Sequence, residues 1–125
     1  MKTTITIIGI LLILILLKII PKKPPNWELF YQYECYHDVT YYLIVGPTAC
    51  KTGTKPNTVA VSRELGYNCG DIIYIGEPIN KKFIVNDITA YHINNTIDIW
   101  YQSVKDIPPE LKQSGRLKNT KILFN

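Results

Sequence analysis

The sequence Phe-Ile-Val-Asn-Asp at residues 83–87 is followed, after a polar link, by Ile-Asp-Ile-Trp-Tyr at residues 97–101. Both segments are rich in β-branched and aromatic residues, which favour β-strands, and each carries one aspartate. Two carboxylates on two strands can form the cleft of a carbohydrate-cutting enzyme. Aspartates at strand ends can equally hold a loop in place. The rest of the chain is needed to distinguish these two roles.

Strand-like segments recur along the chain, most of them bounded by Gly, Pro or Asn. Six strands are predicted, at residues 39–45, 58–62, 71–75, 82–86, 97–101 and 120–124. Short helices are predicted at residues 63–65, 102–106 and 109–113, the last ending near Gly115. An open sheet of six strands would leave long edges on so short a chain. The pattern therefore predicts an all-β, six-stranded closed barrel with short helices.

Strand alternation predicts where the two aspartates point. Phe83 and Val85 look like core residues, and Asp87 shares their face, so Asp87 is expected at the inner side of the barrel rim. Asp98 and Trp100 point away from the apolar face of their own strand. If the two strands are neighbours, both carboxylates line one groove near the rim.

The N-terminal part of the chain differs from the rest. Residues 3–17 carry no charge, and the apolar run extends to residue 20. Its length and the absence of an Ala-x-Ala-like cleavage site predict an uncleaved signal anchor that contacts the membrane through residues 3–20, with a cleaved signal peptide as the alternative. The predicted organisation is an anchor at 1–20, a proline-containing linker and aromatic strap at 21–38, and the barrel at 39–125.

Charge is concentrated in the N-terminal part. The formal net charge is +4, and Lys2, Lys18, Lys22 and Lys23 supply all of it, so the remainder is neutral. A neutral domain argues against a nucleic-acid partner. Three of these lysines come after the apolar run, which favours a cytoplasmic domain by the positive-inside rule. An anchor this close to the N-terminus usually translocates the domain on its C-terminal side, so we predict a single-pass membrane protein with a periplasmic or extracellular domain.

The chain has three cysteines, Cys35, Cys50 and Cys69. One disulfide with one odd thiol fits an exported protein, and three unpaired thiols fit a cytoplasmic one. Cys35 and His37 are spaced as two metal ligands can be, but no second close pair accompanies them. No metal and no cofactor is predicted.

Several motifs together resemble a known fold family. They are Thr-Val-Ala-Val-Ser at residues 58–62, Gly-Asp-Ile-Ile-Tyr-Ile at 70–75, Val-Asn-Asp at 85–87 and Thr-Ile-Asp-Ile at 96–99. Over residues 39–124 the chain resembles the double-psi β-barrels of the rare lipoprotein A group and of the three-aspartate domain in lytic transglycosylase A. Expansins and barwin-like proteins are more distant relatives of that family.

The resemblance implies a peptidoglycan-directed role. Asp87 and Asp98 fall on family acid positions and are the candidate catalytic residues, with Asp87 expected to be the acid and Asp98 its orienting or catalytic partner. Lytic transglycosylases of this type use one carboxylic acid, held neutral by partial burial, to protonate the glycosidic oxygen. Ser62 stands where the family keeps a His or Asp, and a serine cannot supply that proton.

Other candidate residues would contact the glycan rather than react with it. The candidate substrate-binding residues are Ser62, Tyr91, His92 and Trp100. We therefore expect a membrane-anchored protein that cleaves or binds peptidoglycan glycan strands, as a lytic transglycosylase does. The alternative is a non-catalytic glycan-binding or interaction module of the same fold.

Overall fold

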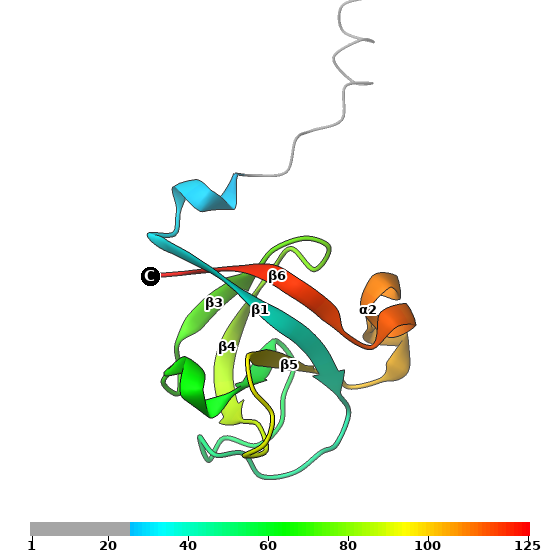
Figure 1. Cartoon of the computed structure of the whole chain (residues 1–125). Helices are drawn as coiled ribbons and strands as arrows, with labels where there is room; N and C mark the ends of the chain where they lie inside the picture. Colours follow the sequence, from blue (N-terminus) through cyan, green and yellow to red (C-terminus); the bar gives the residue numbers. More distant parts are fainter. Residues whose placement is uncertain (1–25) are drawn as a thin grey trace, which may run out of the picture.

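The computed structural model describes residues 26–125, which form a closed barrel of six strands (Figure 1). The strands succeed one another around the barrel in the order β1-β5-β2-β4-β3-β6. Their bounds are β1 Tyr33–Tyr42, β2 Thr58–Val61, β3 Ile72–Ile75, β4 Lys81–Ile88, β5 Thr96–Trp100 and β6 Leu117–Phe124. The predicted six-stranded all-β barrel is confirmed. The predicted anchor at residues 1–20 lies outside the described residues.

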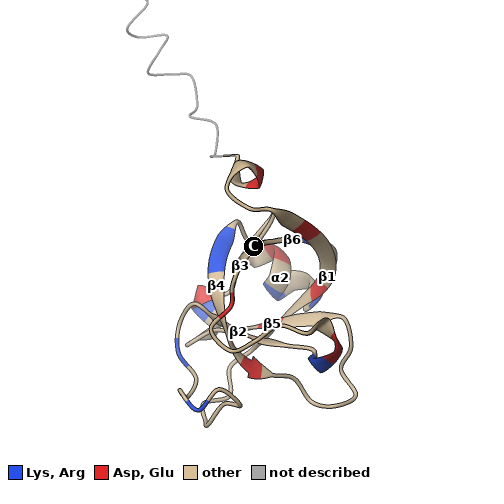
Figure 2. Cartoon of the chain, turned by 90° about the vertical axis from the view of Figure 1, so that its left-hand side faces the viewer, with Lys and Arg blue, Asp and Glu red and all other residues tan. Residues whose placement is uncertain are grey.

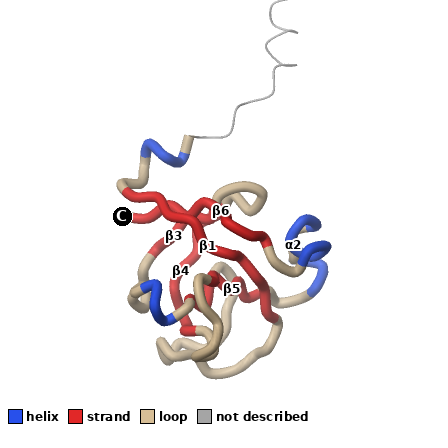
Figure 3. Tube along the Cα trace, viewed as in Figure 1, coloured by secondary structure: helices blue, strands red, loops and turns tan. Residues whose placement is uncertain are grey.

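No helix among residues 26–125 is long and apolar enough to cross a membrane. The helical segments are short and lie on the outside of the barrel (Figure 3). They are η1 Trp27–Leu29, η2 Arg63–Leu65, η3 Val104–Asp106 and α2 Pro109–Ser114. α2 ends at Gly115, whose left-handed φ of 71° suits glycine, as the sequence predicts.

The barrel interior is filled by branched aliphatic side chains. Every strand contributes at least one residue to a single core cluster, which Leu111 of α2 and Ile107 complete. The residues of this cluster are Val39, Val59, Val61, Ile73, Ile75, Phe83, Val85, Ile97, Ile99, Ile107, Leu111 and Ile122. Because inward and outward residues alternate along a strand, this core fixes which side chains face outward.

The first strand is longer at its N-terminal end than the sequence predicts. β1 begins at Tyr33 rather than at residue 39, and Tyr33–His37 pair antiparallel with the end of β6. This segment shows no clear alternation of apolar and polar residues, so its sequence did not predict a strand. The two strands lie side by side near the C-terminus in Figure 1. The last part of the predicted linker and strap, residues 33–38, is therefore part of the barrel.

The long connection between β1 and β2, residues 43–57, is called the 43–57 loop below. A disulfide between Cys50 and Cys69 ties it to the segment before β3. Of the two cysteine arrangements that the sequence leaves open, the structure has one disulfide and one free thiol, Cys35. Basic and acidic residues are scattered around the barrel rather than gathered on one face (Figure 2).

Candidate functional site

Asp87 and Asp98 do not lie on adjoining strands, because β2 lies between β4 and β5. In the register of the sheet, Ala60 of β2 is opposite Asp98 on one side and opposite Asp87 on the other. Asp98 is in turn opposite Thr40 of β1. One line of residues therefore crosses four strands and is called the aspartate row below. Its members are Asp87, Ala60, Asp98 and Thr40. The two aspartates are separated by two strand spacings, ~10 Å between Cα atoms.

A β-bulge places Asp87 in this row. The register of β2 with β4 shifts between Val59 and Ala60, so that Val59 pairs with Val85 and Ala60 with Asp87. The extra residue, Asn86, is buried, and its amide is bound by the 43–57 loop. A bulge reverses the alternation of the strand that carries it. The expectation that Asp87 shares the inward face of Val85 is therefore wrong, and Asp87 lies on the outward face with Asp98.

Asp98 is largely enclosed and makes a close contact with a hydroxyl group. Thr40 Oγ1 donates to Asp98 Oδ1 at 2.7 Å. Burial raises the pKa of the Asp98 carboxyl, while the Thr40 hydrogen bond and the charge of Arg116 oppose that rise. Desolvation disfavours the charged form of a carboxyl group. Asp98 therefore holds its proton more tightly than a solvent-exposed aspartate does.

Asp87 has a different environment. Its Oδ1 accepts the backbone N–H of Ala49, in the 43–57 loop, at 2.8 Å. The same oxygen accepts the N–H of Ile88 at 2.8 Å. These contacts place Asp87 as a support for the loop.

Tyr42 completes the face that carries the aspartate row. It lies two residues after Thr40 on β1, so both point to the same side. Its hydroxyl oxygen is buried and has no hydrogen-bond partner among residues 26–125. Burial, together with the charges of Asp87 and Asp98, raises the pKa of Tyr42 to about 12. The hydroxyl therefore stays protonated at neutral pH and keeps a hydrogen that it can donate.

Thr40 and Tyr42 were missed in the sequence. The alternation Val39-Thr40-Tyr41-Tyr42 places Val39 and Tyr41 against the core and leaves two hydroxyls on the outer face. The alternation alone does not mark Thr40 as a site residue, because its partner Asp98 is known only from the strand register.

Two of the predicted substrate-binding residues are enclosed in the structure. Ser62 is 0 % exposed, and its Oγ accepts the backbone N–H of Thr96 at 3.0 Å. Trp100 is 6 % exposed, and its indole N–H donates to the carbonyl of Ile44 at 3.1 Å. Both side chains connect neighbouring segments of the barrel, and neither offers a ring face or hydroxyl to a ligand in this conformation.

The other two predicted residues lie at the surface, away from the aspartate row. Tyr91 is 86 % exposed, and the Arg63 guanidinium lies 5.9 Å from the centre of its ring. Tyr91 and His92 line a hollow together with Arg63, Glu64 and Asn94. The structure therefore does not bring Tyr91 or His92 together with Asp87 or Asp98 in this hollow.

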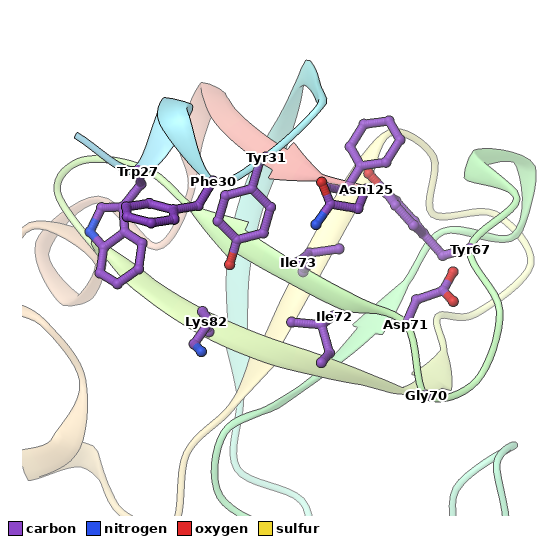
Figure 4. A pocket seen from close by; sticks show the side chains of 11 residues that line it. Trp27, Phe30, Tyr31, Tyr67, Gly70, Asp71, Ile72, Ile73, Lys82 and Asn125 are labelled. Carbon is purple, nitrogen blue, oxygen red and sulfur yellow. The ribbon is translucent and has the colours of Figure 1, made fainter. Parts of the chain in front are cut away.

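A second hollow, of about 560 Å³, lies on the outer side of β3 and β4 and is called the aromatic groove below (Figure 4). Its lining residues are Trp27, Phe30, Tyr31, Tyr67, Gly70, Asp71, Ile72, Ile73, Lys82, Phe124 and Asn125. Trp27 and Tyr31 are positioned by Tyr74, whose ring centre lies 5.0 Å and 6.0 Å from theirs. In Figure 4 the three aromatic side chains at 27, 30 and 31 lie along one edge, with Lys82 and Ile72 opposite them.

Five surface hollows in the described part of the chain are lined by residues other than Asp87 and Asp98. No group of three or more His, Cys, Asp or Glu side chains suited to a metal ion occurs within residues 26–125. The aspartate row is therefore a candidate site by its carboxyl and hydroxyl groups alone, and it lies outside these hollows.

The fold defines the chain as a small closed β-barrel protein. No family model and no curated protein matches the sequence. Among solved structures, the chain is similar to a Streptomyces papain inhibitor, with a TM-score of 0.56 and 17% sequence identity. The match covers 75% of this chain and 96% of that one. At this identity the likeness shows the fold alone.

Proposed function

We propose that this chain is a double-psi barrel protein, of the rare lipoprotein A type, that acts on cell-wall glycan strands with Asp98 as the proton donor. The observation that carries the proposal is the buried Tyr42 hydroxyl, which lacks a partner among residues 26–125 and faces the same side as Asp98. Leaving a buried hydroxyl unpaired costs about 1–3 kcal/mol. A hydroxyl of a bound sugar would become its partner once the groups that cover the Tyr42 oxygen move aside.

The proposed reaction uses one carboxyl group twice. Protonated Asp98 gives its proton to the glycosidic oxygen as the bond to the anomeric carbon breaks. The Asp98 carboxylate then takes the proton of the sugar's 6-hydroxyl, whose oxygen bonds to the anomeric carbon and closes an anhydro ring. The raised pKa of Asp98 favours the first step, and the Thr40 hydroxyl stabilises the carboxylate formed by it.

Further features support the proposed double-psi class of barrel and the proposed location outside the cytoplasm. Two parallel strand pairs, β1 with β5 and β2 with β4, cross an otherwise antiparallel barrel, as in the double-psi arrangement. The Cys50–Cys69 disulfide is typical of an oxidising compartment. With an anchor at residues 3–20, the barrel would lie next to the membrane on the periplasmic or extracellular side, where peptidoglycan is its partner.

Digestion of peptidoglycan sacculi tests the proposal. The full chain, purified in a mild detergent, is expected to release anhydro-muropeptides. Asp98→Asn should lower that release at least ~100-fold, because it removes the proton donor. Asp106→Asn, which changes an exposed aspartate on η3, is the matched control and should keep full activity. No release by the wild-type chain would overturn the catalytic proposal.

If sacculi bind the protein but are not cut, the binding alternative holds, and the aromatic groove is its natural location. Aromatic rings beside charged and amide groups suit a sugar, which has both apolar faces and hydroxyls. Trp27→Ala should then reduce sedimentation with sacculi, whereas Tyr36→Ala, which removes an exposed ring outside the groove, should leave it unchanged.

A second function is favoured by a different surface. Ile44 and Val45 are 79 % and 77 % exposed in the 43–57 loop. The loop is held by the Trp100 bond to Ile44 and by paired bonds between Gly46 and Thr54. A rigid loop that presents apolar side chains is suited to binding a protein partner. Because the similar structure is a papain inhibitor, inhibition of papain that Ile44→Asp abolishes would support this second function.

A further inference from the structure

A cluster of four polar side chains lies at one end of the barrel, around the free thiol. Cys35 and His37 are two residues apart on β1 and point to the same side. Cys35 Sγ lies 3.2 Å from His37 Nε2, and the hydroxyl of Tyr67 lies 3.4 Å from the sulfur and 3.3 Å from the same nitrogen. On the far side of the ring, His37 Nδ1 lies 2.8 Å from Asn95 Oδ1. These residues are called the thiol cluster below.

Asn95 is fixed firmly enough to orient the histidine. Its backbone N–H donates to a Glu64 carboxylate oxygen, and its carbonyl accepts the N–H of Asp38 at 2.9 Å. Because Asn95 Oδ1 accepts from His37, the hydrogen of the neutral imidazole is on Nδ1. Nε2 is then an acceptor, and it faces the thiol. A nucleophile, a base and a group that orients the base are the parts of an activated nucleophile.

Cys35 has the exposure and the neighbours that such a role requires. The chain has three cysteines, and the other two form the disulfide, so Cys35 is its only free thiol. The thiol is partly exposed. Burial raises the pKa of Cys35, and the Tyr67 hydroxyl opposes that rise. A thiol in this state reacts readily only if a base takes its proton, and His37 is in position to do so.

We propose that Cys35, His37 and Asn95 form a nucleophilic thiol site that forms a mixed disulfide with a small disulfide compound. His37 Nε2 takes the thiol proton as the sulfur attacks one sulfur of the compound. A bond forms between Cys35 and that sulfur, the original S–S bond breaks, and the leaving thiolate takes the proton from His37. The Tyr67 hydroxyl donates to the Cys35 sulfur while it carries negative charge.

Two observations favour a disulfide as the reactant. The Cys50–Cys69 bridge belongs to an oxidising environment, in which small disulfides persist. Tyr67, which contacts Cys35, also lines the aromatic groove (Figure 4), so one side chain connects the groove to the thiol. The groove offers room for the part of the compound that remains attached to Cys35.

The test measures the rate at which oxidised glutathione adds to Cys35 of the full chain at neutral pH, monitored by intact mass. The folded wild-type chain should react at least ~10-fold faster than the same chain unfolded in urea with its disulfide intact. This comparison needs no variant. A folded-state rate equal to or below the unfolded-state rate would overturn the proposal and leave Cys35 as an inert packing residue.

Variants separate the roles within the thiol cluster. His37→Gln should slow the reaction at least ~10-fold, because the base is lost. Asn95→Asp keeps an acceptor for Nδ1 and should retain the rate, whereas Asn95→Gly should lower it. Both replacements suit the left-handed φ of 52° at this position. An unchanged rate in His37→Gln, with the fold retained by circular dichroism, would also contradict the proposal.

Discussion

Asp87 and Asp98 occupy matching places on either side of Ala60, yet their surroundings differ. Asp87 lies near the end of β4, where backbone N–H groups of Ala49 and Ile88 reach its carboxylate. Asp98 lies in the middle of β5, where burial and two neighbouring hydroxyl-bearing residues, Thr40 and Tyr42, surround it. The first environment uses a carboxylate to hold a loop. The second favours a carboxyl group that keeps its proton.

This difference shows that the chemical role of an aspartate depends on the groups that contact its carboxyl group as much as on its residue type. Both aspartates stand on strands of the same barrel and on the same face. The 43–57 loop brings its amides to Asp87, and β1 brings its hydroxyls to Asp98. The comparison predicts that changes in the loop affect Asp87 first and leave Asp98 intact.

The largest expected effect comes from opening the Cys50–Cys69 disulfide. The double variant Cys50→Ser with Cys69→Ser releases a link between residues 19 apart, which should lower the free energy of unfolding by about 3 kcal/mol. Urea denaturation measures this loss. Because Asp98 is held by β1 rather than by the loop, its titration should be unchanged. A shifted Asp98 titration would contradict the independence of the two aspartates.

A smaller loss is expected from Asp87→Ala. The variant leaves the N–H groups of Ala49 and Ile88 without their acceptor. Water can reach this region, so the expected cost is about 1 kcal/mol in the free energy of unfolding. Asp106→Ala, at an exposed aspartate that Ser103 contacts, is the matched control and should cost less than about 0.5 kcal/mol. Equal losses in the two variants would remove the supporting role assigned to Asp87.

The smallest effect is a change in pH dependence from Asp98→Asn. The pKa of Asp98 is raised in the folded state above its ordinary value of 3.8, so the folded chain holds the proton more tightly than the unfolded chain. The contribution of Asp98 to the free energy of unfolding is therefore fully present below pH 3.8. It is lost as the pH rises from 3.8 through the higher pKa of the folded state. Asp98→Asn should therefore be more stabilising relative to wild type at pH 7 than at pH 3 in thermal unfolding.

Asp38 provides a control of opposite sign for this measurement. The backbone N–H of Asn119, assisted by Arg116, lowers the pKa of Asp38 against a smaller opposing effect of burial. Its contribution is present above pH 3.8 and is lost as pH falls below that value. Asp38→Asn should therefore be more destabilising at pH 7 than at pH 3, by a small amount because solvent screens the partly exposed pair of Asp38 and Arg116. Identical pH trends in both variants would contradict the difference between their environments.

Much of the barrel could be predicted from local patterns. β-branched segments and their turns predicted all six strands, and the short helices fall at residues 63–65, 104–106 and 109–114 close to the expected places. These signals are local, since each depends on residue types within one segment. The start of β1 was misplaced because an aromatic-rich segment gave no clear alternation, and pairing with β6 determines its conformation.

The site depended on information that alternation alone does not contain. The bulge at Asn86 turns Asp87 to the outer face, and the placement of β2 between β4 and β5 separates the two aspartates. Both features arise from pairing between distant segments. For the same reason the hydroxyl of Tyr42 and the enclosure of Ser62 were not visible in the sequence. The catalytic role of Asp87 and the roles of Tyr91 and His92 in glycan binding stay predictions.

Whether Asp98 keeps its proton is tested most directly by a carbon-detected NMR titration of its carboxyl group in the folded chain. We expect a pKa above 3.8, and a further rise in Thr40→Val, because that variant removes the hydrogen bond that favours the charged form. A pKa at or below 3.8 would mean that Asp98 is ionised like an ordinary surface carboxylate, and it would contradict its role as the proton donor.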